Sequence, residues 1–179
     1  MDTGAKNYAR YLSGDDGAVE ALVDEYKNGL TLYLNSIVCN IFTAEELMEE
    51  TFFRLITKRP RFSGKSSFKT FLYAIGRNAA VDYIRKNRAS LAPIEAHEKE
   101  LIERESIEAA VIRDESRAAL RRALDSLPDE QRQAVHLTFF EEMKCEEAAR
   151  VMKKSRHAVE NLVYRAKKAL KAELEKEGY

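Results

Sequence analysis

Residues 145–175 read CEEAARVM, then KKS, then RHAVENLVYRAKKALKAELE. Apolar side chains recur at three- and four-residue steps on both sides of the polar KKS tripeptide, which predicts two helices joined by a tight turn. Ala149 stands where the first helix can pack closely on the second. The second helix is expected to bury Val159, Leu162, Val163, Ala166 and Leu170. The spacing is that of a helix-turn-helix.

The opposite face of the second helix carries side chains suited to reading base edges in a duplex. In the major groove Arg can read guanine, Asn can read adenine, and Glu can accept from the amine of cytosine. The candidate residues are Arg156, His157, Glu160, Asn161, Tyr164, Arg165 and Lys168. Because any surface helix has a polar face, this pattern alone leaves a solvated helix as an alternative.

The rest of the chain has the composition of a helical protein. It has 7 glycine and 3 proline residues among 179, and no glycine stands between Gly76 and Gly178. We therefore predict an all-α fold of two small helical domains joined by a linker, with boundaries at 1–88, 89–114 and 115–179. A helix after Pro128 is expected to bury Val135, Leu137 and either Phe139 or Phe140.

The first domain is expected to contain two long helices before residue 60. An apolar stripe from Val19 to Ile41 predicts the first, with Cys39 in the core. Residues 43–46 have the form of a capping box for the second. That helix should bury Leu47, Met48, Phe52, Leu55 and Ile56, while its other face shows a row of glutamates. From charge alone, the glutamates are read as compensation of the helix dipole.

A basic segment follows in a chain whose net charge is zero. Residues 61–90 carry 7 basic side chains and one acidic side chain. Cations, aromatic rings and hydrogen-bonding groups alternate in the loop 61–67 and on the next helix, mainly outside its buried stripe of Phe68, Phe71, Leu72, Ile75 and Ala79. Single-stranded nucleic acid is bound by this mixture. The candidates are Phe62, Ser63, Lys65, Ser66, Lys69, Tyr73, Arg77, Asn78, Arg85 and Lys86.

Two stretches of the chain resemble a known family. The segments AEELMEETFFRL (44–55) and RFSGKSSFKTFLYAIGRNAAVD (61–82) resemble region 2 of bacterial extracytoplasmic-function (ECF) sigma factors. The segment ALDSLPDEQR (123–132) and the helix-turn-helix that ends in VYRAKKAL (163–170) resemble region 4. The resemblance covers about residues 19–88 and 115–172. Family members often have glycine where Lys153 stands.

This resemblance implies a set of partners and sites. The chain would be a dissociable subunit of core RNA polymerase that recognises promoter DNA, and an anti-sigma factor would bind it. The loop and helix at 61–86 would bind the melted −10 element, with Phe62, Lys65, Ser66 and Asn78 near a flipped base. The second helix of the helix-turn-helix would read the −35 element. Glu45, Glu46, Glu49, Glu50 and Phe53 would bind polymerase.

Other classes of function are weighed against this one. A conventional DNA-binding regulator would bind duplex DNA tightly without polymerase, and would leave Phe62 and Asn78 without a role. A sigma mimic that sequesters an anti-sigma protein would not need the basic segment. An enzyme is disfavoured, because the three histidines are scattered and the two cysteines form no metal motif. We expect no catalytic residues, cofactor, metal or membrane insertion, and a cytoplasmic location.

Overall fold

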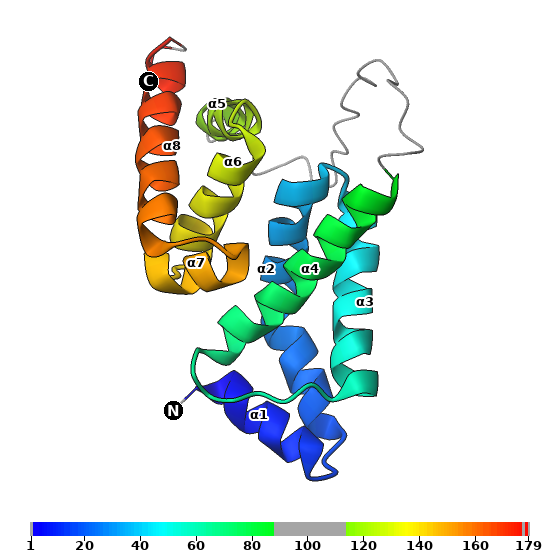
Figure 1. The fold of residues 1–179 in the computed structure, drawn as a ribbon. Helices are drawn as coiled ribbons and strands as arrows, with labels where there is room; N and C mark the ends of the chain where they lie inside the picture. Colours follow the sequence, from blue (N-terminus) through cyan, green and yellow to red (C-terminus); the bar gives the residue numbers. More distant parts are fainter. Residues whose placement is uncertain (1, 88–113, 177, 179) are drawn as a thin grey trace.

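The computed structural model describes residues 2–87, 114–176 and 178, and every regular element in these ranges is a helix. The first domain contains α1 (Thr3–Leu12), α2 (Gly17–Val38), α3 (Ile41–Lys58) and α4 (Phe68–Asn87). The second contains α5 (Asp114–Asp125), α6 (Asp129–Val135), η1 (His136–Phe140), α7 (Cys145–Met152) and α8 (Arg156–Lys176). The all-α prediction is confirmed (Figure 1). Nearly all of the predicted linker at 89–114 lies outside the described residues.

The turn between α2 and α3 differs from the prediction. Cys39 ends α2 in the left-handed conformation, with φ 52°, and its side chain is exposed rather than in the core. Asn40 then caps α3, and its side-chain oxygen accepts a hydrogen bond from the Thr43 amide at 3.0 Å. Asparagine is among the preferred N-cap residues. The predicted capping box at 43–46 is therefore wrong, because the helix begins before it.

Helix α1 was not predicted from the sequence. Tyr8 and Tyr11 bury its inner face, with 1% and 4% of their surfaces exposed. The Tyr8 hydroxyl donates to the Pro60 carbonyl oxygen at 2.7 Å, so α1 holds the chain where α3 has ended. Asp2 caps α1 and also accepts from the Phe68 amide, which begins α4. The N-terminal segment therefore fixes the start of the helix on which the −10 candidates lie.

The helix-turn-helix in the second domain is confirmed. Helix α7 ends at Met152, and Lys153 takes the left-handed conformation, with φ 53°, before α8 begins at Arg156. Val159 and Ala166 on α8 are fully buried. Helices α5, α6 and α7 all contact α8 (Figure 1). The side of α8 that faces away from α5, α6 and α7 is therefore accessible to solvent along the helix.

A short π-helix, η1, joins α6 to the loop before α7. It includes His136–Phe140, and the Glu141 amide donates to the His136 carbonyl oxygen at 3.1 Å, five residues back. Leu137 is buried, but Phe139 and Phe140 are 51% and 54% exposed. The expectation that one of these two rings lies in the core is wrong, because the wide turn directs both outward.

The two domains pack directly on each other. Helices α2 and α4 of the first domain contact α6, η1 and α7 of the second (Figure 1). A single buried hydrophobic cluster contains Leu30 and Leu72 from the first domain and Leu137 and Val151 from the second. The Tyr33 ring lies 5.9 Å from the His136 ring, centroid to centroid. The contact between the domains is therefore a packed core with polar groups around it.

Candidate nucleic-acid interface

The loop 61–67 presents several of the −10 candidates. Ser63 and Lys65 are exposed and Ser66 is half-buried, beside Gly64, whose φ of 70° suits glycine. Ser67 ends the loop by capping α4, because its hydroxyl accepts from the Thr70 amide at 3.2 Å. The polar side chains of the loop are thus held at the N-terminus of α4, where backbone amides favour anions.

Phe62 lies against the aromatic core of the first domain. Its ring is 5.7 Å from the Phe68 ring at an interplanar angle of 79°, and 5.2 Å from the Phe71 ring. Phe62 is half-buried, so part of the ring is accessible. A ring supported from behind in this way can offer a fixed surface for stacking a base.

Three −10 candidates on α4 face the second domain rather than solvent. Lys69, Tyr73 and Arg77 are spaced four residues apart and therefore share one side of the helix. Tyr73 is fully buried and stacks on Tyr33 with centroids 5.5 Å apart. The expectation that Tyr73 lies outside the buried stripe is wrong, because Tyr33 of α2 stacks on its ring and Glu141 of the second domain accepts from its hydroxyl. Arg77 donates to the Gln133 side-chain oxygen at 3.2 Å.

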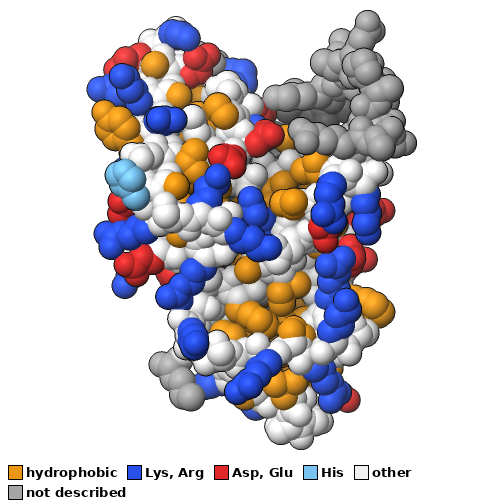
Figure 2. Space-filling model, in the orientation of Figure 1, with side chains coloured by type: hydrophobic (Ala, Val, Ile, Leu, Met, Phe, Trp, Pro, Cys, Tyr) orange, Lys and Arg blue, Asp and Glu red, His pale blue; other side chains and the backbone are white. Residues whose placement is uncertain are grey.

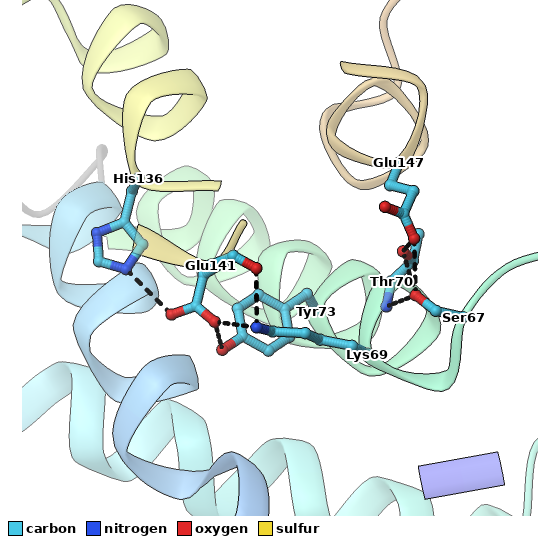
Figure 3. Close-up of polar contacts among 7 residues, drawn as sticks. All are labelled: Ser67, Lys69, Thr70, Tyr73, His136, Glu141 and Glu147. Carbon is cyan, nitrogen blue, oxygen red and sulfur yellow. Dashed lines mark hydrogen bonds and ion pairs between the residues drawn. The ribbon is translucent and has the colours of Figure 1, made fainter. Parts of the chain in front are cut away.

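Glu141, which was not predicted from the sequence, is the centre of this contact. Its carboxylate accepts from Lys69 Nζ at 2.6 Å and from the Tyr73 hydroxyl at 2.8 Å. His136 Nε2 is 3.6 Å from the other carboxylate oxygen. We call these four side chains the Glu141 cluster (Figure 3). Only 9% of the Glu141 side chain is exposed, so the carboxylate depends on these partners rather than on water.

The environment keeps Glu141 ionised and Tyr73 protonated. Burial raises the pKa of the Glu141 carboxyl, but the nearby His136 ring and the donors Lys69 and Tyr73 outweigh it and lower the pKa to about 2. Burial and the adjacent Glu141 charge raise the pKa of the Tyr73 hydroxyl well above its ordinary value. The pair is therefore a neutral donor on an anionic acceptor, which is a strong arrangement.

A glutamate of the helix-turn-helix, Glu147, also reaches the first domain. Glu147 Oε1 accepts from the Ser67 hydroxyl at 3.0 Å and from the Thr70 hydroxyl at 3.3 Å (Figure 3). Its other oxygen accepts from the Lys144 amide at 3.1 Å and so caps α7. Arg150 on the same helix donates to the Lys65 carbonyl oxygen at 2.5 Å. Helix α7 thus lies over the end of the loop that carries the −10 candidates.

The remaining −10 candidates are outside the domain contact. Asn78 is half-buried, Lys86 is exposed, and Arg85 is exposed in an ion pair with Asp82 at 3.1 Å. Figure 2 shows Lys and Arg side chains, with apolar surface between them, across the face on which α4 lies. The structure therefore divides the predicted residues into an accessible set and the covered set Lys69, Tyr73 and Arg77.

On α8 the predicted −35 residues share one accessible face. Glu160 is half-buried. The other six are exposed: Arg156, His157, Asn161, Tyr164, Arg165 and Lys168. Arg156 pairs with Glu160 at 2.7 Å and with Glu146 at 3.0 Å. Asn161 Nδ2 is 3.2 Å from His157 Nε2. The charge of Arg156 is thus balanced locally, whereas within the described residues no acidic side chain forms an ion pair with Arg165 or Lys168 on the same face.

On α3 the glutamates predicted to bind polymerase are joined by aromatic rings. Glu45, Glu46, Glu49 and Glu50 are exposed, and Phe53 is 65% exposed. Phe42, which was not predicted, is 60% exposed. Residues 42, 46, 49 and 53 follow helical steps of four and three, so they form one stripe. Two exposed rings with acids between them are typical of a protein-binding surface rather than of simple dipole compensation.

The described residues contain no group of three or more His, Cys, Asp or Glu side chains arranged to hold a metal ion. Within the same ranges, no helix combines the length and the apolar character needed to cross a membrane.

Comparison with known proteins identifies both halves of the chain. Residues 22–90 match Sigma-70 region 2, and residues 117–170 match Sigma-70 region 4. The RNA polymerase sigma-H factor of Pseudomonas aeruginosa is 29% identical over 170 residues, which cover 90% of this chain and 88% of that protein. The ECF RNA polymerase sigma factor BldN of Streptomyces coelicolor is 32% identical over 167 residues, or 90% of this chain and 62% of that protein.

A solved structure has the same fold. The sigma factor RpoE of Bartonella quintana, determined in complex with the anti-sigma factor NepR, aligns with a TM-score of 0.72 at 21% identity, over 87% of this chain and 96% of that chain. Region 2 matches the domain that carries the α4 candidates, and region 4 matches the domain that carries the helix-turn-helix. The chain therefore belongs to the ECF sigma factors of bacterial RNA polymerase.

Proposed function

We propose that the chain is a dissociable initiation subunit of RNA polymerase, which directs the enzyme to a set of promoters and assists in opening them. The observation that carries the proposal is the presence of both regions 2 and 4, in that order, each with its candidate surface on a different helix. The polymerase supplies the chemistry of RNA synthesis, and the chain supplies recognition. A cytoplasmic location follows from this role.

The exposed stripe on α3 is the proposed polymerase contact. Glu46 and Glu49 supply negative charge for a basic partner helix, and Phe42 and Phe53 supply apolar area at the two ends of the stripe. Aromatic rings often contribute most of the binding energy of an interface, while charges at its edge speed association and select the partner. This combination suits a subunit that must bind core polymerase and later leave it.

The loop 61–67 and α4 are the proposed contact with the melted −10 element. Extruding a base costs a few kcal/mol, which stacking and edge hydrogen bonds must offset. Phe62 provides a supported ring, Ser66 and Asn78 provide hydrogen-bonding groups, and Lys65 provides charge for phosphate. Lys69, Tyr73 and Arg77 add to this surface only when the second domain moves away from α4, because its side chains now contact all three.

The exposed face of α8 is the proposed contact with the −35 element. Asn161 and Arg165 stand where they can reach base edges in a major groove, and Lys168 is suited to phosphate. Because both domains belong to one chain, binding at one element raises the effective concentration of the other domain at its own element. The two contacts together can select a promoter that neither contact would bind tightly.

An anti-sigma factor is the proposed regulatory partner. The support is the likeness in fold to a sigma factor solved with the anti-sigma factor NepR. Such a partner would compete with polymerase or promoter DNA for the surfaces described above.

Run-off transcription tests the proposed function. Purified core polymerase would be incubated with a genomic promoter library, with and without the chain, and the transcript starts mapped. We expect a new and limited set of starts that depends on the chain. Unchanged starts would refute the proposal, and tight duplex binding without polymerase would instead favour a conventional DNA-binding regulator.

A further inference from the structure

We propose that region 4 acts as an internal inhibitor of region 2, because Glu141 and Glu147 occupy the donors on α4 that the −10 strand would otherwise use. The inference rests on the proposed function, since it takes α4 as the strand-binding helix. It adds that the free chain is closed and binds single-stranded DNA weakly until the two domains separate.

The first support is the identity of the groups that Glu141 engages. Lys69 and Tyr73 are a cation and a hydroxyl donor on the basic segment, and both were predicted to contact DNA from their residue types. In the structure both donate to one carboxylate, at 2.6 Å and 2.8 Å. Phosphate and carboxylate oxygens bind the same kinds of donors. A DNA strand and Glu141 therefore cannot use these donors at the same time.

The second support comes from Glu147, one helix further along. It accepts from the Ser67 and Thr70 hydroxyls, and Arg150 holds the Lys65 carbonyl oxygen. Ser67 ends the loop that carries Phe62 and Lys65. Helix α7 therefore covers the loop end of α4 while Glu141 covers Lys69 and Tyr73 in its first two turns, so one closed arrangement obstructs a continuous stretch of the proposed strand path (Figure 3).

The third support is the way α2 makes room for the Glu141 cluster. A Cβ atom at Gly29 would lie 2.5 Å from the Tyr73 hydroxyl and 2.8 Å from Glu141 Oε1. Real Cβ atoms do not approach other atoms so closely. Glycine at this position thus permits the Tyr73–Glu141 pair to form beside α2. It also offers a substitution that opposes closure without changing any charge.

Two variants of the full-length chain test the inference. Glu141→Gln removes the acceptor charge, and Gly29→Ala crowds the pair while placing a better helix former in α2. Glu142→Gln is the matched control for charge, because Glu142 is exposed and adjacent. Asn28→Ala is the matched control for helix propensity, because Asn28 is exposed on the same helix. Helicity by circular dichroism verifies that each protein is folded.

Two measurements would be made on all five proteins. Small-angle X-ray scattering gives the radius of gyration, which should be near 16 Å for a compact wild type, by the scaling for about 180 residues. Fluorescence anisotropy at low salt gives the Kd for a labelled random-sequence single-stranded DNA of about 15 nucleotides. We expect both variants to be larger and to bind at least about tenfold more tightly, because the apparent Kd is inversely proportional to the open fraction. Both controls should match the wild type within about twofold.

The results separate this inference from the proposed function. Variants that remain as compact as the wild type and bind no more tightly would overturn the inference. Variants that open without gaining affinity would also overturn it, because the contact would then not be inhibitory. Run-off transcription by the wild type is a separate test. If the wild type does not redirect transcript starts, the proposed function is refuted. If it does, but the two variants neither expand nor bind DNA more tightly, only the internal inhibition is refuted.

Discussion

The variant Glu141→Gln should lose a pH-dependent part of its free energy of unfolding. The Glu141 carboxyl has a pKa of about 2 in the folded chain, against an ordinary value of 4.5. At about 1.4 kcal/mol per pKa unit, this difference corresponds to about 3 kcal/mol of stabilisation at neutral pH. Because only 9% of the side chain is exposed, screening by solvent reduces the figure little.

The direction of the pH dependence follows from the lowered pKa. A carboxyl with a depressed pKa in the folded chain stabilises it fully above its unfolded pKa, and the stabilisation is lost as the pH falls from 4.5 towards about 2. The variant should therefore be about 3 kcal/mol less stable than the wild type at about pH 7, with a Tm lower by roughly 6–12 °C, and the difference should shrink below about pH 4.

Urea unfolding followed by far-ultraviolet circular dichroism measures this difference at several pH values. Glu142→Gln is the control, since it removes the same charge from an exposed neighbour and should leave stability within about 0.5 kcal/mol of the wild type. A loss of stability in Glu141→Gln that is equal at neutral and acidic pH would refute the electrostatic reasoning. A loss below about 1 kcal/mol at neutral pH would refute the assigned magnitude.

Four further outcomes follow from the structure. Asn78→Ala should reduce promoter opening, measured by permanganate footprinting, while polymerase binding is retained. Charge reversal at Glu46 and Glu49 should weaken association with core polymerase at least severalfold, measured by surface plasmon resonance. Unchanged affinity would mean that these residues only compensate the helix dipole. Asn161→Ala should alter base preference in the −35 element and not in the −10 element, in a binding selection with holoenzyme. Lys153→Gly should raise stability by up to about 1 kcal/mol in calorimetry, because Lys153 has φ 53° and glycine accepts that conformation without strain.

Much of the fold could be predicted because strong apolar periodicity extends through α2, α3, α4, α7 and α8. Their stripes are long, and local spacing is enough to reveal them. Helix α1 was missed because Tyr8 and Tyr11 are its main apolar residues, in a segment that is otherwise polar or small. These two tyrosines are buried and donate hydrogen bonds to carbonyl oxygens about fifty positions away, which no local pattern contains.

The candidate surfaces could be predicted only as helix faces. The accessible face of α8 and the glutamates of α3 were found because each follows from the position of a buried stripe. The burial of Tyr73 could not be found in this way, since Tyr33 of α2 and Glu141 of the second domain together cover a side of α4 that is polar by local pattern. The role of Glu141 could not be predicted, because in the sequence it is one of two adjacent glutamates. Lys69 and Tyr73, which donate to it, are about seventy residues away.

The π-helix η1 makes the match between the two domains sensitive to the number of residues as well as to their type. In a regular α-helix each residue advances by about 100°, so deleting one residue between His136 and Phe140 would turn all that follows by about that angle. Because α6 before η1 and α7 after it both pack on α8, the second domain would then have to repack internally, and a different side chain would stand opposite Lys69. A change of one residue in length would therefore alter both the packing of the second domain and its fit to the first.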